Sequence, residues 1–143
     1  MLEEQARRRV RAEQSACPLG DDAADILDVV YPADGLILAT PVYCENVSAQ
    51  MKAFMDRNVF RYAHDKWLRA KVVGLVAVTA ETGLDETLAA LLRYVALSTD
   101  GDVPIFSAGG HGDTAGAAAE KPELLAAARK LAADLAGALL SGA

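Results

Sequence analysis

Three stretches of apolar residues alternate along the chain with segments in which apolar residues recur at helical spacing. Residues 35–40 and 71–79 are apolar at consecutive positions, a pattern typical of strands that are covered on both faces in a parallel sheet. Residues 102–107 predict a third, shorter strand. Because strand and helix alternate three times, the sequence predicts an α/β fold with an open parallel sheet and helices on both faces.

Helical spacing predicts one helix before the first strand and one after it. The first helix is capped by Asp21 or Asp22 and ends at Pro32, because proline cannot continue a helix. Its expected buried residues are Ile26, Val29 and Val30. The second helix begins near Val47, with Asn46 or Ser48 as its cap. Its apolar stripe consists of Val47, Met51, Phe54, Met55 and Asn58 or Val59.

Two further helices are predicted in the second half of the chain. The helix at residues 84–97 follows Thr82 and Asp85, whose spacing resembles a capping box. The last helix spans residues 122–140 and has proline in its first turn, where this residue is favourable. The glycine-rich residues 109–116 are predicted to form a flexible connection ahead of it.

A length of 143 residues fits one domain with a sizeable core. We expect this domain at residues 17–143, preceded by a helical segment at residues 1–16. The 20 acidic and 14 basic residues give a net charge of −6, which argues against a nucleic-acid surface, because phosphate binding needs clustered cations. The one basic cluster is flanked by glutamates and fits a solvated helix; it consists of Arg7, Arg8, Arg9 and Arg11.

Cysteine count and hydropathy argue against several other classes of protein. The two cysteines, Cys17 and Cys44, are too few for a disulfide framework or a four-thiolate metal site. The two histidines lack the spacing of metal ligands, so no metal is expected. No apolar run approaches the roughly 20 residues of a membrane helix, and the N-terminus lacks the apolar centre of a secretory signal. We therefore expect a soluble cytoplasmic protein with reduced thiols.

The region around the first strand resembles a known family, the flavodoxin-like NAD(P)H-dependent FMN reductases, in the branch related to iron-sulfur flavoproteins. The resemblance rests on the residues that lead into the strand, on the loop after it and on the helix that follows. These residues are Ala33-Asp34-Gly35, Thr40-Pro41-Val42-Tyr43, Val47-Ser48-Ala49-Gln50-Met51-Lys52, Phe54 and Asp56-Arg57. A looser likeness runs from Cys17 to the last helix. The resemblance implies a flavodoxin-like fold.

The resemblance also implies an FMN site where loops leave the carboxyl ends of the first two strands. The loop at residues 40–47 would lie along the flavin ring, and the loop at residues 79–83 would border its pyrimidine side. Pro41 fixes the backbone, Tyr43 offers a flat amphipathic surface, and free amides can reach flavin oxygens and N5. The expected cofactor-binding residues are Thr40, Pro41, Val42, Tyr43, Cys44, Glu45, Asn46, Val47, Thr79, Ala80, Glu81, Thr82 and Gly83.

Two parts of the family pattern are missing. The family opens with a strand and a Ser- and Gly-containing loop that holds the FMN phosphate, whereas this chain reaches the lead-in to the third family strand at Ala33. The fold is therefore expected to be N-terminally shortened, with the strand at residues 35–40 at an edge of the sheet. Either the coding start is placed too late, or residues 1–16 or a second subunit cover this edge. Cys17 alone matches the cysteine cluster of the iron-sulfur branch, so no iron-sulfur centre is expected.

The resulting interpretation is an FMN-binding, NAD(P)H-dependent oxidoreductase that passes a hydride from nicotinamide to flavin N5 and on to an unknown small-molecule acceptor. No residue is required as a general acid, base or nucleophile. A homodimer or higher homo-oligomer is expected, with no nucleic-acid or membrane partner. Glu45 and Glu81 either orient the flavin or face water, and His111 and Cys44 are interpreted as ordinary loop residues. The alternative is a shortened flavodoxin-like domain without tight flavin binding that acts in assembly or protein interaction.

Overall fold

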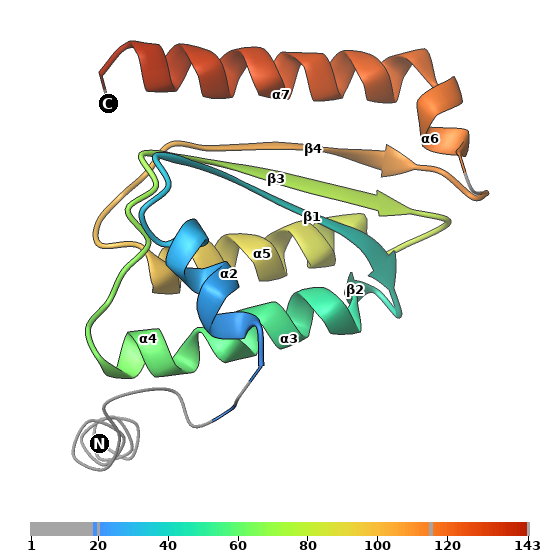
Figure 1. Ribbon diagram of the computed structural model, residues 1–143. Coiled ribbons are helices and arrows are strands. Elements are labelled where there is room, and N and C mark those ends of the chain that lie inside the picture. The colour runs from blue at the N-terminus through green and yellow to red at the C-terminus, as the bar shows by residue number, and fades with distance from the viewer. Residues whose placement is uncertain (1–18, 20, 115, 143) are drawn as a thin grey trace.

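The structure is a computed structural model with an open four-stranded sheet, whose strands follow the order β2-β1-β3-β4 (Figure 1). β1 (Gly35–Tyr43), β3 (Val72–Thr79) and β4 (Ile105–His111) run parallel, so the loops after them meet at one edge. The predicted α/β fold with an open, mostly parallel sheet is confirmed. The structure describes residues 19, 21–114 and 116–142.

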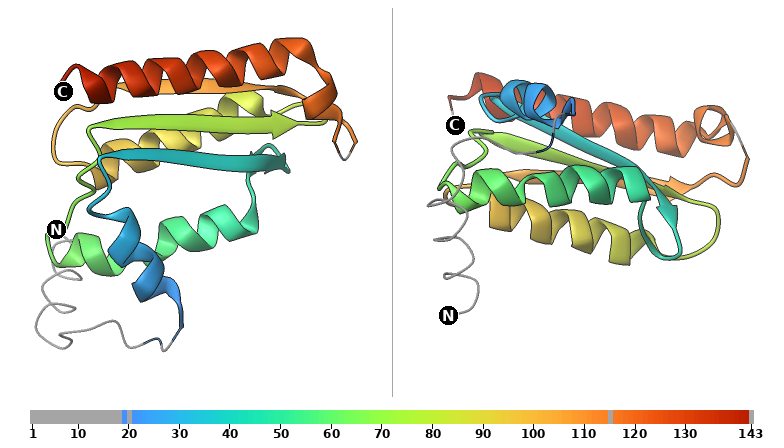
Figure 2. Two further views of the ribbon diagram at one scale, coloured as in Figure 1. Left: turned by 45° about the horizontal axis from the view of Figure 1, so that its top comes forward. Right: turned by 60° about the horizontal axis from the view of Figure 1, so that its bottom comes forward.

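Helices lie on both faces of this sheet, as expected (Figure 2). One face carries α7 (Pro122–Leu140), which packs on β3 and β4. The other face carries α3 (Ala49–Arg57) and α5 (Leu84–Ser98). The shorter helices are α2 (Ala23–Val30), α4 (Val59–Ala63) and α6 (Ala117–Glu120).

β3 is the centre of the core, because it has strands on both sides and helices on both faces. Val73 and Leu75 pack toward α5, while Val72 packs with Leu131 and Leu135 of α7. A Cβ added at Gly74 would lie 2.9 Å from Cδ1 of Leu135. Glycine therefore lets α7 approach this strand closely, and the prediction that residues 71–79 form a strand covered on both faces is confirmed.

Within the described part of the chain, helices cover one face of β1, which corrects the prediction for residues 35–40. Leu38 and Thr40 are buried, but Ile37 and Ala39 on the opposite face are exposed, Ile37 by 55%. α7 lies over β3 and β4, and its last turn approaches β1 at Gly35. Consecutive apolar residues therefore occur here on a strand with one exposed apolar face.

β1 also runs further than predicted, through Tyr43, and pairs there with the two-residue antiparallel strand β2 (Asn46–Val47). Cys44 and Glu45 form the turn with φ angles of 50° and 57°. Two successive positive φ values are the geometry of a tight hairpin turn, usually made with Asn or Gly. Much of the stretch expected to be a loop is thus a hairpin with an uncommon turn sequence.

The helix predicted from residue 47 is divided into α3 and α4 at Asn58. Nδ2 of the Asn58 side chain donates to the carbonyl oxygen of Phe54 at 2.7 Å. Its own amide bonds to the carbonyl of Met55, one residue short of the α-helical partner. An asparagine side chain that competes for backbone groups in this way is a known cause of helix interruption.

Several element boundaries and caps also differ from prediction. The first helix begins at Ala23 and buries Leu27, whereas Ile26 and Val29 are exposed. α5 is preceded by Gly83 in a left-handed conformation without a side-chain cap, so the capping box predicted from Thr82 is wrong. The third strand is shifted toward the C-terminus and includes residues expected in the flexible connection.

The predicted helical segment at residues 1–16 and Cys17 lie outside the described residues, so the division at residue 17 stays a prediction. The last helix is confirmed with proline at its start. Among the described residues, none of the helices has the length and apolar character needed to span a bilayer.

Candidate functional site

The carboxyl edge of the sheet brings the two predicted loops into direct contact. Oγ1 of Thr82 donates to Oε1 of Glu45 at 3.1 Å. Gly83 has a φ of +85°, and a Cβ there would lie 2.4 Å from Cα of Glu45. The β1–β2 turn therefore packs on the backbone of the β3–α5 loop, and glycine is the residue that permits this approach.

Two threonines at the ends of the predicted strands hold these loops in place. Oγ1 of Thr40 accepts the amide of Ser48 at 3.0 Å and donates to the carbonyl of Pro41 at 2.8 Å. Oγ1 of Thr79 donates to the carbonyl of Thr82 at 2.5 Å and accepts the amide of Glu81 at 3.3 Å. Both hydroxyls are buried and already bonded to backbone, so these residues position loops.

An open pocket of about 460 Å³ lies beside this edge, between the outer side of β1 and the start of α3. Of the thirteen predicted residues, Pro41 and Tyr43 line it, and Tyr43 is 62% exposed. The remaining lining residues are Ala39, Ser48, Gln50, Met51 and Phe54. Sequence reasoning did not place these five in the site, although four belong to the helix motif that carried the family resemblance.

The start of α3 adds polar backbone groups to the pocket. Ser48 is the N-cap, with extended φ and ψ angles, and its Oγ accepts the amide of Met51 at 3.3 Å. The amides of Ala49 and Gln50 precede this bonded turn, so helix geometry leaves them without an intrahelical acceptor. The first turn of α3 can therefore donate hydrogen bonds toward the pocket, one of whose walls is Gln50.

His111 reaches the same edge from the end of β4, where it lies in register with Thr79. Its Nε2 lies 2.9 Å from the carbonyl oxygen of Glu81, so a proton on Nε2 donates to that oxygen. Nζ of Lys121 donates to the carbonyl oxygen of His111 at 2.7 Å. A histidine expected in a flexible loop is instead a strand residue that braces the β3–α5 loop.

The charge of this edge is mostly negative. Exposed carboxylates follow β1 at Glu45, follow β3 at Glu81, and begin α5 at Asp85 and Glu86. Cys44 is an exposed free thiol. No group of three or more metal-type ligands occurs in the described part of the chain.

Comparison with known proteins decides the family. The family described as NADPH-dependent FMN reductase matches residues 2–101 of the chain. The chain belongs to the NADPH-dependent FMN reductase family. This confirms the resemblance drawn from the Thr40-Pro41-Val42-Tyr43 loop and the helix motif after it.

Iron-sulfur flavoproteins are relatives of this FMN reductase family chain. The protein from Archaeoglobus fulgidus is 40% identical over 96 residues, which cover 67% of this chain and 43% of the relative. The protein from Methanocaldococcus jannaschii is 48% identical over 69 residues, covering 48% of this chain and 35% of the relative. The chain therefore spans less than half the length of these curated relatives.

Solved structures confirm the flavodoxin-like fold of this FMN reductase family chain. The NAD(P)H:quinone oxidoreductase from Methanothermobacter marburgensis has a TM-score of 0.56 at 19% identity, over 92% of this chain and 71% of that chain. An apo NADH:FMN oxidoreductase has a TM-score of 0.55 at 19% identity, over 96% and 78% of the two chains. At this identity the likeness shows the fold alone.

Proposed function

We propose that the protein is an FMN-dependent oxidoreductase that takes electrons from NAD(P)H and passes them to a small-molecule acceptor. The observation that carries the proposal is the contact between the two predicted loops at the carboxyl edge, beside an open pocket lined by Pro41 and Tyr43. Ligands of open α/β sheets bind at this edge. The family supports a flavin as the cofactor.

The lining of the pocket supports a flavin ring as its ligand. Tyr43 presents an exposed aromatic surface on which a planar ring can stack, and Pro41 offers a rigid apolar contact. The amides of Val47 and Ser48 are occupied by Oδ1 of Asn46 and Oγ1 of Thr40. Hydrogen bonds to ring oxygens are therefore expected from the Cys44–Glu45 turn, where the backbone is held by Gly83.

The described residues do not fit the phosphate of FMN. The pocket lining holds no basic side chain, and the exposed acidic residues of this edge repel a dianion. We therefore propose that the described chain binds the ring portion, with the thirteen predicted residues and the start of α3 around it. FMN bound there would supply a hydride acceptor at N5, and the residues around the pocket would orient its ring.

We also propose a cellular location, an oligomeric state and the kinds of partner for this protein. We place the protein in the cytoplasm as a homodimer or higher homo-oligomer, without nucleic-acid or membrane partners. The net charge of −6 supports the absence of a nucleic-acid partner. The exposed face and outer edge of β1 support association between copies.

Titration of the purified protein with FMN and with riboflavin tests the proposed function, with flavin fluorescence as the signal. We expect saturable quenching by both, with similar affinity, because the described site recognises the ring and not the phosphate. Tyr43→Ala should raise the dissociation constants of both flavins about tenfold, because the aromatic ring that stacks on the flavin is lost. Val29→Ala, an exposed change on α2, is the control. No quenching by either flavin would refute the proposal.

A second candidate is an assembly or interaction domain that binds no flavin tightly. The specific observation in its favour is the exposed apolar face of β1. Next to it lies an outer edge that, among the residues the structure describes, is paired by β2 at Val42 and Tyr43. Sedimentation at micromolar concentration, with and without FMN, separates the two functions. A monomer fully occupied by FMN refutes this candidate. An oligomer that binds no FMN and sediments the same with and without it supports this candidate.

A further inference from the structure

The end of β4 holds the loop between β3 and α5 from the side that lies away from β1. His111, the last residue of β4, is in register with Thr79 in the parallel ladder. The amide of Gly112 donates to the carbonyl oxygen of Thr79 at 2.8 Å, and Nζ of Lys121 donates to the carbonyl oxygen of His111 at 2.7 Å. These bonds fix the backbone from which the His111 side chain extends.

The side chain of His111 holds one peptide group of this loop. Its Nε2 lies 2.9 Å from the carbonyl oxygen of Glu81. A carbonyl oxygen can only accept, so Nε2 carries a proton and donates it to this bond. The peptide group between Glu81 and Thr82 is therefore tied to the end of β4.

This tie sets the direction of the Thr82 amide. In a trans peptide the C=O of one residue and the N–H of the next point in opposite directions, and the described chain has no cis peptide bond. Because the carbonyl of Glu81 points to His111, the amide of Thr82 points away from His111 and from β4. Among the described residues this amide has no hydrogen-bond acceptor, and Thr82 is exposed. The loop thus presents a free donor at the carboxyl edge.

The other hydrogen bonds of the loop do not hold this peptide group. Oγ1 of Thr79 accepts the amide of Glu81 and donates to the carbonyl of Thr82, which lie on either side of it. Turns of the same length occur with a peptide group in either of two opposite orientations, and Glu81 and Thr82 are both exposed. His111 therefore decides which way the Thr82 amide points.

We propose that His111 is a positioning residue of the flavin site, which directs the Thr82 amide to a carbonyl oxygen of the flavin ring. The inference rests on the proposed function, because the acceptor belongs to the proposed cofactor. Carbonyl oxygens only accept hydrogen bonds, so a free amide matches them. Thr82 also bonds to Glu45 of the β1–β2 turn, beside the proposed place of the ring. His111 acts through the Glu81–Thr82 peptide and does not touch the flavin.

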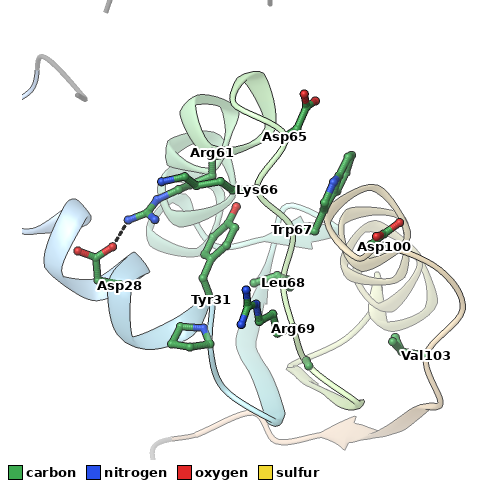
Figure 3. Close-up of a pocket in the computed structure, with 12 residues that line it drawn as sticks. Asp28, Tyr31, Arg61, Asp65, Lys66, Trp67, Leu68, Arg69, Asp100 and Val103 are labelled. Atoms are coloured by element: carbon green, nitrogen blue, oxygen red, sulfur yellow. Dashed lines mark hydrogen bonds and ion pairs between the residues drawn. The ribbon is translucent and has the colours of Figure 1, made fainter. Parts of the chain in front are cut away.

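A large cavity elsewhere in the described chain provides a control for flavin bound away from this loop. It has a volume of about 640 Å³ and is lined by residues that precede β1, β3 and β4, so it lies at the amino ends of the strands (Figure 3). Its charged lining residues are Asp28, Asp65, Asp100, Arg61, Lys66 and Arg69, in which carboxylates and cations balance. Lys66→Ala changes this cavity and leaves the carboxyl edge intact.

Titration of the whole protein and four variants with riboflavin tests the inference, with flavin fluorescence as the signal. His111→Ala removes the donor and should raise the dissociation constant about fivefold. His111→Gln supplies an amide donor at a similar reach and should restore the constant to within about twofold of the unmodified protein. Ser107→Ala, an exposed change on the same strand, and Lys66→Ala should leave the constant unchanged.

Thermal unfolding of the same proteins without flavin separates positioning from damage to the fold. The hydrogen bond between His111 and Glu81 is exposed, so its removal should cost little stability. We therefore expect the unfolding midpoint of every variant to stay within about 3 °C of the unmodified protein.

Four results would overturn this inference while leaving flavin binding in place. They are equal riboflavin affinity of His111→Ala and the unmodified protein, no recovery in His111→Gln, a loss of affinity that follows a lower unfolding midpoint, and a loss confined to Lys66→Ala. The last result would place the flavin in the other cavity. If the unmodified protein binds no riboflavin, the proposed function is refuted together with this inference, so the two failures are distinguishable.

Discussion

β1 and β3 are neighbouring parallel strands with the same apolar sequence pattern, but the sheet places them in different environments. β3 has β1 on one side, β4 on the other and helices on both faces, so both sets of its side chains are buried. β1 has helices over one face, and Ile37 on the other is exposed. The position of a strand in the sheet, which the strand's own residues do not encode, decides how much of its apolar surface is buried.

The two strands also end differently, and this shapes the candidate site. β1 turns back through two residues with positive φ into the antiparallel strand β2. β3 leads into a loop that Thr79 closes by hydrogen bonds to its backbone. The tight turn brings Glu45 into contact with Gly83. β1 therefore contributes a hairpin to the candidate site, and the loop after β3 contributes the backbone on which this hairpin packs.

The difference between the two strands is tested most directly by shortening one aliphatic side chain on each strand to alanine. Leu75→Ala on β3 should lower the free energy of unfolding by about 3 kcal/mol, because it leaves a cavity in a packed core. Ile37→Ala on the exposed face of β1 should lower it by less than about 1 kcal/mol. Urea denaturation measures both. Equal losses would mean that the exposed face of β1 is covered in solution.

A smaller effect is expected where the two strand ends meet. Gly83→Ala should lower the free energy of unfolding by about 2 kcal/mol, since alanine is strained at a φ of +85° and its Cβ would clash with the backbone of Glu45. Gly137→Ala on α7 is the matched control, because no atom lies near its added Cβ. That control should stabilise the protein by about 0.5–1 kcal/mol through higher helix propensity. Thermal unfolding that ranks the two variants the other way would show that the loops do not touch.

Removal of the Thr40 hydroxyl should lower the free energy of unfolding somewhat less than the change at Gly83. Thr40→Val leaves the buried amide of Ser48 without its acceptor, which should cost about 1–2 kcal/mol of unfolding free energy. Thr40→Ser retains the hydroxyl and should recover much of that loss. Chemical denaturation of the three proteins measures the difference. A valine variant as stable as the original would indicate that water or another group replaces this bond.

The smallest effect on stability is expected at the exposed face itself. Ile37→Lys should change the free energy of unfolding by no more than about 0.5 kcal/mol, because the side chain is largely solvated. It should nevertheless weaken any association of copies through β1, since a charge on an exposed edge strand opposes pairing. Sedimentation velocity over a range of concentrations measures that association. Unchanged association would place the contact between copies elsewhere on the molecule.

Much of the fold could be predicted because its signals are local. Consecutive apolar residues identified β3, proline at its first turn identified the start of α7, and helical spacing identified α5. The tight turn at Cys44 and Glu45 could not be predicted, because neither residue type favours a positive φ. The break at Asn58 depends on one side chain turning back to the backbone, which periodicity does not record.

The candidate site was predicted only as far as the motif extended. The motif placed Pro41 and Tyr43 at the pocket, and its helix part contained Ser48, Gln50, Met51 and Phe54, which also line it. His111 was missed because its role depends on strand register, which lies beyond local sequence. The assignment of the thirteen cofactor residues stays a prediction.

The one-sided pairing of β1 has a consequence for how its backbone exchanges hydrogen with solvent. In a parallel ladder, alternate residues direct their amide hydrogens to opposite sides of the strand. Between Gly35 and Pro41 one set of amides faces β3, while the described chain places no strand beside the other set. Deuterium uptake should therefore alternate residue by residue along β1 and be uniformly slow along β3, so that protection from exchange follows a period of two on one strand only.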